Sequence, residues 1–278
     1  MKGKGGRVLP LVFLAVLNLR AAQDARPLPD THALFVATRD NLARSERDQR
    51  FFAYKERRTE IRTNPFGRIG TGPARVYDVV PLPDGAGFTR RILERDGTPV
   101  PDGEVERRER RNRGTGRPNR AAALDDAVAA LDFTIERRER AGGRSLIVVK
   151  FTPRPDAKPQ TREGRLARYF VGDIWVDEDL HEIVRVEATA TDTIAYGYGF
   201  IARLNEGTRI TVTREQVEPN LWLPVSVRFK GEGRALLFRK LNVDYAVDWF
   251  DYRRVLSNSQ LPNAQLPNAQ LPSAQRPN

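Results

Sequence analysis

The stretches WLPVSVRFK (222–230) and KLNVDYAVDWF (240–250) decide the fold. Apolar and polar residues alternate in both, so that Val243 and Tyr245 would point to one side of a strand while Asp244 points to the other. A period of two is typical of antiparallel strands that have one face toward water and one toward a core. The alternation therefore predicts a sheet with a single apolar face, and such a face needs a cover.

The same kind of pattern recurs along most of the chain. The further predicted strands are FFAYKERRTEIR (51–62), ARVYDVVPL (74–82), GFTRRILERDG (87–97), FTIERRER (133–140), SLIVVKFTP (145–153), ARYFVGDIWVD (167–177), EIVRVEATATD (182–192) and TRITVTREQV (208–217). A strongly twisted sheet of about ten strands rarely stays flat. We therefore predict an α+β fold, mainly antiparallel β: a curled open sheet, or half-barrel, of about ten strands with a few helices covering its concave face.

Two segments have helical rather than strand periodicity. Residues 29–50 place apolar residues at helical spacing after a cap at Asp30 or Thr31, and residues 101–131 end in an alanine-rich helical stretch capped by Asn119. We interpret 101–131 as a helical insertion, or lid, within the sheet. Two helices are a small cover for ten strands, so the concave side is either filled with side chains or partly empty.

The first residues have the three regions of a secretory signal peptide. Basic residues precede the apolar run VLPLVFLAVLNL (8–19), and small residues follow it. The run is shorter than the roughly 18 residues that a membrane span needs, and its proline argues against the alternatives of a retained anchor or a buried helix. We predict cleavage after Ala21 or Ala22, a signal peptide over 1–22 and a folded domain over 23–256. The chain has no cysteine, so it forms no disulfide and has no thiol to lipidate; we expect a soluble periplasmic protein.

The chain is strongly basic, with a formal charge of +11 that falls to +7 once Lys2, Lys4, Arg7 and Arg20 leave with the signal peptide. Positive charge concentrates in EVERRERRNRGTGRPNR (104–120), which we interpret as a solvated face or a linker, with attraction to an anionic membrane surface as the alternative. The export signal and the absence of aromatic residues among these arginines argue against a nucleic-acid partner. The repeats of 257–278 predict a disordered tail to which we assign no role.

Residues suited to catalysis or metal binding are few. His32 and His181 stand apart from any matching nucleophile or ligand pattern. The acidic cluster at 177–182 lacks the spacing of a calcium loop and reads better as a polar hairpin turn. The G-x-G of YGYGF has no third glycine and no following helix. We therefore predict neither catalysis nor a cofactor nor a metal, and an enzyme with an unrecognised site stays as an alternative.

An oversized apolar junction separates two of the predicted strands, in TDTIAYGYGFIARLNEG (191–207). A tight hairpin would use a short polar turn such as Asn-Gly. This segment either forms an apolar flap at the mouth of the concave side, its glycines permitting sharp turns, or folds inward as part of the core.

Several motifs resemble a known group of proteins. The motifs are YKERRTEIR, VYDVVPLPDGAGFTRRILERDGTPV, FTPRP (151–155), GDIWVDEDLHEIVRVEA (172–188), GFIARLNEGTRI and WFDYRRV (249–255). Their order resembles exported bacterial proteins labelled outer membrane lipoprotein-sorting proteins, within the LolA/LolB superfamily. The resemblance covers roughly residues 50–255. It implies a curled antiparallel sheet with helices as a lid and a lipid-type ligand. No functional residue of those carriers can be placed on a position here.

The resemblance and the apolar face together predict a non-catalytic, monomeric periplasmic carrier of lipid or lipoprotein acyl chains, with an inner- or outer-membrane protein as a further partner. An envelope-stress sensor or partner-binding module on the same fold is the alternative. Each apolar residue could instead belong only to the core. The predicted ligand-binding residues of the cavity and flap are Trp175, Val184, Val186, Ile194, Tyr196, Tyr198, Phe200, Trp222, Val225 and Phe229.

Overall fold

A computed structural model describes residues 26–63, 69–83, 87–101, 105–110, 120–196, 202–235 and 239–255. The predicted signal peptide, the tail and the flap residues Tyr198 and Phe200 lie outside this part of the chain, and the side chain of Tyr196 is not described. The helices are α1 (Thr31–Asp48), α2 (Arg120–Ala129) and α3 (Arg162–Ala167), with a short 3-10 turn at Gln49–Phe51. The strands are β1 (Phe52–Thr63), β2 (Ile69–Pro81), β3 (Gly87–Arg95), β4 (Thr98–Pro99), β5 (Val105–Arg110), β6 (Leu131–Ala141), β7 (Arg144–Pro153), β8 (Phe170–Asp177), β9 (Ile183–Ala190), β10 (Ile194–Tyr196), β11 (Ala202–Leu204), β12 (Arg209–Glu218), β13 (Leu221–Ala235) and β14 (Arg239–Arg254).

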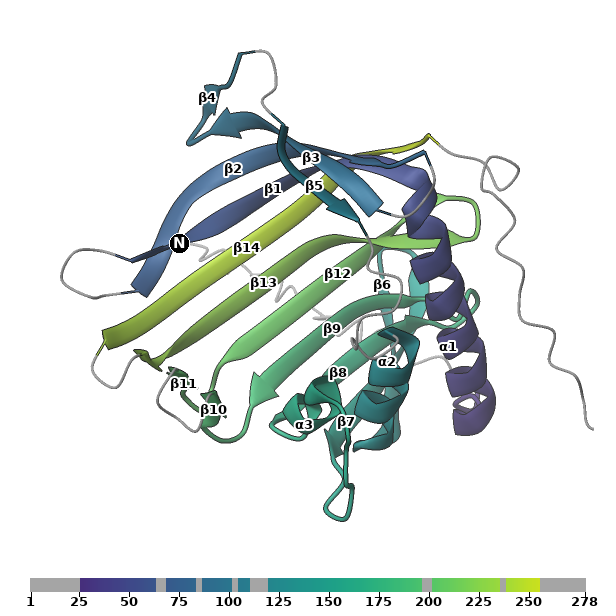
Figure 1. The fold of residues 1–278 in the computed structure, drawn as a ribbon. Helices are drawn as coiled ribbons and strands as arrows, with labels where there is room; N and C mark the ends of the chain where they lie inside the picture. The colour runs from purple at the N-terminus through teal and green to yellow at the C-terminus, as the bar shows by residue number, and fades with distance from the viewer. Residues whose placement is uncertain are drawn as a thin grey trace, which may run out of the picture.

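The fourteen described strands form one curled sheet that does not close into a barrel (Figure 1). The strand order is β4-β3-β2-β1-β14-β13-β12-β9-β8-β7-β6, and β5 pairs with β3. Apart from one parallel bridge between β14 and β2, the pairs are antiparallel. The predicted fold class is confirmed, and short strands account for the number above ten.

Helix α1 lies where β8 ends, while α3, with α2 beside it, lies near the start of β8 (Figure 1). The Asp30 carboxylate accepts a hydrogen bond from the backbone N–H of Ala33 at 2.8 Å, which caps α1 as predicted. Helix α3 is an addition to the prediction. Its cap residue, Thr161, donates its backbone N–H and its hydroxyl to the Asp126 carboxylate of α2, at 2.7 and 2.6 Å. These hydrogen bonds lower the pKa of Asp126 and fasten α2 to α3.

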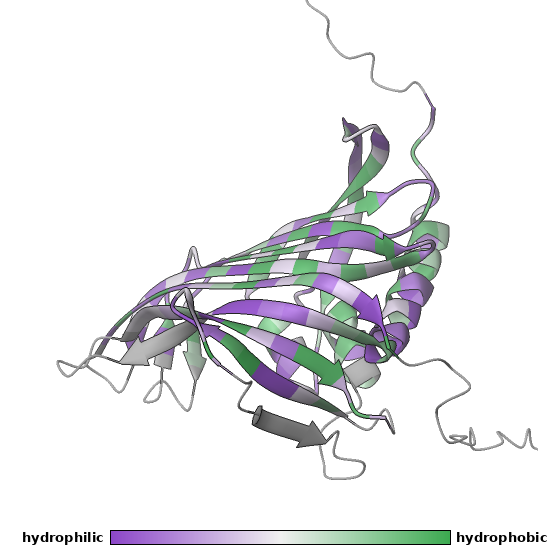
Figure 2. Cartoon of the chain, turned by 90° about the horizontal axis from the view of Figure 1, so that it is seen from above, coloured by the Kyte–Doolittle hydropathy of each residue, from purple (hydrophilic) through white to green (hydrophobic). Residues whose placement is uncertain are grey.

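The helices pack on the apolar face of the sheet. Leu34 of α1 is 2% exposed and lies in a buried cluster with Ile147 and Val176 of β7 and β8. Leu166 of α3 packs against a second cluster, which Phe229 of β13 also contacts. Bands of alternating hydropathy run along the strands in Figure 2, as the period of two predicted. The opposite face of the sheet carries the polar residues of the same strands, and we call it the polar face.

The segment 101–131 is only partly helical. Helix α2 occupies its alanine-rich end, as predicted. The earlier part, which we expected to be a solvated face or a linker, contains β5, whose backbone pairs with β3 from Gly87 to Arg91. Alternating charged residues such as VERRER can extend a sheet because the ladder needs only backbone donors and acceptors.

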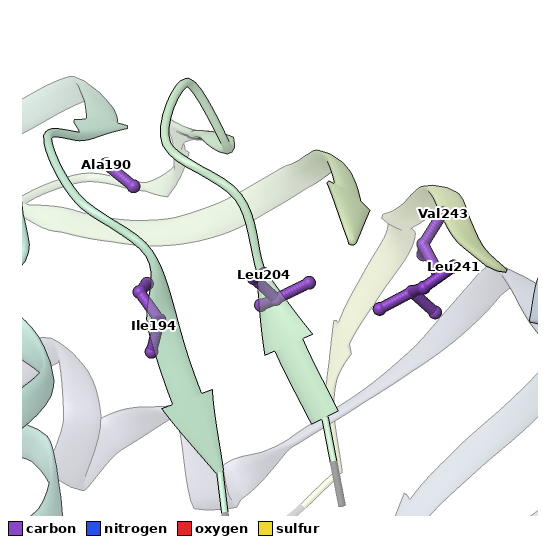
Figure 3. Close-up of a cluster of buried hydrophobic side chains, with 5 residues drawn as sticks. All are labelled: Ala190, Ile194, Leu204, Leu241 and Val243. Carbon is purple, nitrogen blue, oxygen red and sulfur yellow. The ribbon is translucent and has the colours of Figure 1, made fainter. Parts of the chain in front are cut away.

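The apolar junction 191–207 contains a small hairpin. Strands β10 and β11 pair with each other, and β11 continues the ladder onto β13. Ile194 is 1% exposed and Leu204 9% exposed, and both lie with Leu241 and Val243 of β14 in one buried cluster (Figure 3). The two ends of the junction thus fold inward as core, which corrects the placement of Ile194 in a flap. The tip between them is outside the described residues.

One glycine of β8 is required by close packing. A Cβ atom on Gly172 would collide with the backbone carbonyl of Glu187 and would approach the Phe151 ring to 2.8 Å. We predict that Gly172→Ala destabilises the protein by about 1–3 kcal/mol, because the backbone of β9 cannot move aside as a flexible side chain could. Urea unfolding followed by circular dichroism measures this change. Gly70→Ala in β2 is the control, since its nearest neighbour is 3.4 Å away; an equal loss in both variants would contradict the explanation.

Candidate functional site

The centre of the apolar face is a continuous row of aliphatic side chains that crosses five strands. Each residue stands directly opposite the next in the cross-strand register, so all share one face. Neighbouring strands lie about 4.8 Å apart, which gives the row a width of roughly 19 Å. The row consists of Ile174, Val186, Val212, Val227 and Val247.

A second row runs beside the first on the same face. It contains Gly172, Ala188, Ile210, Phe229 and Tyr245, again in direct register. We call the two rows together the apolar wall. Its β8 end is covered by α1, and Leu166 of α3 packs against the buried cluster that Phe229 and Tyr245 also contact. Between these covers Val186, Val212 and Val227 are only half-buried, so part of the wall is accessible.

The predicted binding residues divide among several places. Val186 and Phe229 belong to the apolar wall. Val184 of β9 and Val225 of β13 are the extra residues of β-bulges in their own strands, so Val184 has no residue directly opposite it in β8 and Val225 has none in β12; both are half-buried. The bulges locally disturb the alternation from which these two valines were assigned to the concave side.

Trp175 lies on the polar face, contrary to its predicted place in the cavity. It stands opposite Arg185, while its neighbour Ile174 stands opposite Val186 on the wall. The Arg185 guanidinium carbon lies 5.4 Å from the centre of the indole ring, and the indole N–H donates to the Glu139 carboxylate at 3.0 Å. A period of two forbids Trp175 and Val186 from lining one cavity.

Trp222 is buried at the α1 end of the sheet and is 2% exposed. The Arg144 guanidinium carbon lies 4.6 Å from the centre of its ring. Its backbone carbonyl accepts a hydrogen bond from Arg214 at 2.7 Å. Trp222 is therefore a buried packing residue at the α1 end of the sheet and is not part of the accessible wall.

Arg214 belongs to a buried ionic cluster that the sequence analysis did not identify. It contacts the Glu182 carboxylate at 3.4 Å, and Arg44 of α1 reaches the other carboxylate oxygen at 3.5 Å. Burial raises the pKa of Glu182, while the charges of Arg214 and Arg44 oppose the rise. Burial also lowers the pKa of Arg214. The cluster connects α1 to the β8–β9 turn, where Asp177 accepts hydrogen bonds from the turn backbone; the predicted polar hairpin is confirmed there.

A second ionic cluster interrupts the apolar wall at its β1 end. Arg58 stands opposite Val247 of the central row, and Glu56 stands opposite Trp249 on the same face. Glu56 is 5% exposed; its carboxylate accepts a hydrogen bond from the Trp249 indole N–H at 3.1 Å and contacts Arg90 at 3.4 Å and Arg58 at 3.6 Å. The apolar wall therefore ends in buried charge, with Tyr77 stacked beneath both guanidinium groups.

The Glu56 cluster supports a stability prediction. Glu56→Ala would leave Arg90, whose side chain is 11% exposed, without its carboxylate, and we expect a loss of about 3 kcal/mol in the free energy of unfolding. Glu218→Ala is the matched control, because its pair with Arg254 is much more exposed and contributes about 1 kcal/mol at most. Urea unfolding of both variants measures the difference. Similar losses in the two would show that Glu56 has no special role.

The described residues offer accessible apolar surface on the wall. They contain no cluster of three or more histidine or acidic side chains arranged to hold a metal ion. None of the described helices is both long and apolar enough to cross a membrane. The arrangement suits the burial of apolar groups against the wall, with charged side chains at one end.

No family model matches the sequence, and no curated protein matches it. Among solved structures, the chain is similar to a DUF1329 family protein from Desulfovibrio piger (15% identity, 82% of this chain and 96% of that chain, TM-score 0.32). It is also similar to a putative outer membrane lipoprotein-sorting protein domain from Vibrio parahaemolyticus (12%, 83% and 96%, TM-score 0.35) and to a LolA superfamily protein from Nitrosomonas europaea (14%, 81% and 99%, TM-score 0.29). Two of these structures carry the names of the group that the sequence resembles, and at this level of similarity the likeness says nothing about what the chain binds.

Proposed function

We propose that this protein is a non-catalytic, exported carrier that holds a lipid or lipoprotein acyl chain against the apolar wall. The observation that supports the proposal is the set of half-buried valines between the helices: Val186, Val212 and Val227 stand in direct register and are incompletely covered. Accessible, contiguous apolar surface of this kind marks a site for a ligand or a partner.

The energetics of area burial are sufficient for binding. Each methylene removed from water contributes about 0.8 kcal/mol, so ten methylenes give about 8 kcal/mol before the costs of ordering are subtracted. A micromolar dissociation constant needs about 8 kcal/mol net, so a chain somewhat longer than ten methylenes would reach it. No specific polar contact is needed for that affinity.

The proposal predicts that a fluorescent fatty-acid analogue binds the delipidated protein and that Val186→Thr combined with Val212→Thr weakens binding at least tenfold. Threonine keeps the β-branched shape that suits a strand but adds a hydroxyl, whose burial without a partner costs about 1–3 kcal/mol. Fluorescence titration measures the dissociation constant of each variant. Native mass spectrometry of protein purified from its own compartment identifies any co-purifying lipid.

Val171→Thr is the matched control. Val171 lies on β8, is half-buried like the wall residues, and stands opposite Thr189 on the polar face. Trp175→Phe is a second control for the same face. Both controls should bind the analogue as the unaltered protein does. If the controls and the wall variant lose affinity equally, or if the folded protein binds no analogue, the carrier proposal is wrong and a partner-binding module becomes the better explanation.

A further inference from the structure

A cavity of about 630 Å³ lies where the β10–β11 hairpin meets the ends of β13 and β14. Leu204 and Leu241 belong to the buried cluster of Figure 3 on the apolar face, and Gly233 stands directly opposite both of them. Because sides alternate along a strand, the residues next to these three face the polar side. The charged and amide residues around the cavity are Arg203, Asn205, Glu232, Arg234, Lys240 and Asn242.

Three of these residues form a row of like charge. Arg203 of β11 stands directly opposite Arg234 of β13, and Arg234 stands directly opposite Lys240 of β14. The Cβ atoms of directly opposite residues lie about 5 Å apart, so like charges at these positions repel one another. We call these three residues the cation row.

No carboxylate among the described residues forms an ion pair with the cation row. None of the three cations has an ion pair or side-chain hydrogen bond with any described residue, and all are exposed. Glu232 is the single acidic residue around the cavity, which leaves a net charge of +2. The adjoining stretches 197–201 and 236–238 contain no acidic residue in the sequence. Elsewhere on the polar face, by contrast, Arg228 binds Asp248 at 2.6 Å.

Backbone packing holds the row together. A Cβ atom on Gly233 would collide with the backbone carbonyl of Arg203, so the glycine lets β11 approach β13 closely enough to bring Arg203 beside Arg234. The backbone N–H of Asn205 donates to the carbonyl of Glu232 at 2.8 Å, which extends the pairing of β11 with β13 by one residue. The repulsion within the row is therefore built into the sheet register.

We propose that the cation row and its cavity bind a phosphate group, carried either by a small soluble phosphate compound or by a lipid headgroup. Guanidinium groups match phosphate oxygens with paired hydrogen bonds, and an ammonium group adds a point charge. A phosphate monoester dianion neutralises the net charge of the cavity, and a phosphodiester headgroup, a monoanion, halves it; either reduces the repulsion between opposed side chains. This site is on the polar face, so it does not depend on the proposed acyl-chain carrier.

The test uses two kinds of probe, soluble phosphates and lipid vesicles, with the full mature chain. Isothermal titration with pyrophosphate and with glycerol 1-phosphate measures binding of soluble phosphates, and flotation with phosphatidylglycerol vesicles, against phosphatidylcholine vesicles, measures binding of a headgroup. The test variant carries Arg203→Gln, Arg234→Gln and Lys240→Gln. The control carries Arg209→Gln, Lys230→Gln and Arg228→Gln, which remove the same charge from the same face outside the cavity.

We expect the test variant to lose at least tenfold in affinity while the control loses less than threefold. Loss of soluble phosphate binding identifies a free phosphate compound as the ligand, and loss restricted to phosphatidylglycerol vesicles identifies a lipid headgroup. Equal losses in test and control would mean that binding follows overall charge, and the proposal would be wrong. It would also be wrong if the unaltered protein bound neither probe.

A stability measurement separates binding from folding. At low ionic strength and without phosphate, Arg234→Gln alone should raise Tm, because it removes the central charge of the row. Pyrophosphate should raise the Tm of the unaltered protein and leave that of Arg234→Gln nearly unchanged. A fall in Tm for Arg234→Gln without ligand would show that the residue has a structural role and would overturn the proposal.

Discussion

Cross-strand register is the constraint on which the rest of this structure depends. Each residue of the sheet has its side fixed by the residue opposite it, and a shift of one position would exchange the two faces. The register that brings Val212 opposite Val227 also brings Thr211 opposite Arg228 on the other side. One set of backbone hydrogen bonds therefore determines both the apolar wall and the charged surface behind it.

The apolar face is not uniformly apolar, and its two ionic clusters follow from the same register. Arg214 is in step with Val212 along β12, so the period of two directs it toward the helices rather than toward water. Glu56 is in step with Arg58 along β1 in the same way. Charges in such places need partners, because burying an unpaired charge is far more costly than burying an ion pair. The clusters delimit the accessible wall, one beneath α1 and one at β1.

Where alternation was regular, the sequence contained the information on both the strands and their sides. It identified β13 and β14 closely, and with them the positions of Val227 and Phe229. Trp175 was misplaced although the signal was present: in FVGDIWVD (170–177) it alternates in step with Asp173 and Asp177, which marks the polar face. The bulges at Val184 and Val225 give no such signal, because an extra residue in one strand is defined only by its partner strand.

The ionic clusters could be anticipated only in part. The stretch KERRTE (55–60) has charge on both faces of a strand, which indicates that some charge must be buried or that the strand is exposed on both sides. The partners of Glu56 are distant in the chain, however: Arg90 lies 34 positions away and Trp249 lies 193 positions away. No local pattern encodes such a meeting. It depends on the pairing of β1 with β14, two strands from opposite ends of the described chain.

Charged residues are arranged differently on the two faces of the sheet. On the helix-covered face the buried cations Arg214 and Arg90 each have a carboxylate within 3.4 Å, as the cost of burial requires. The cation row lies on the water-exposed face, where solvent screening permits like charges to stand opposite one another. Screening permits that arrangement but does not stabilise it, and a glutamine at any of the three positions would be less repulsive. Register places the three cations together although their repulsion does not favour folding, and this is the observation from which we propose a ligand of opposite charge.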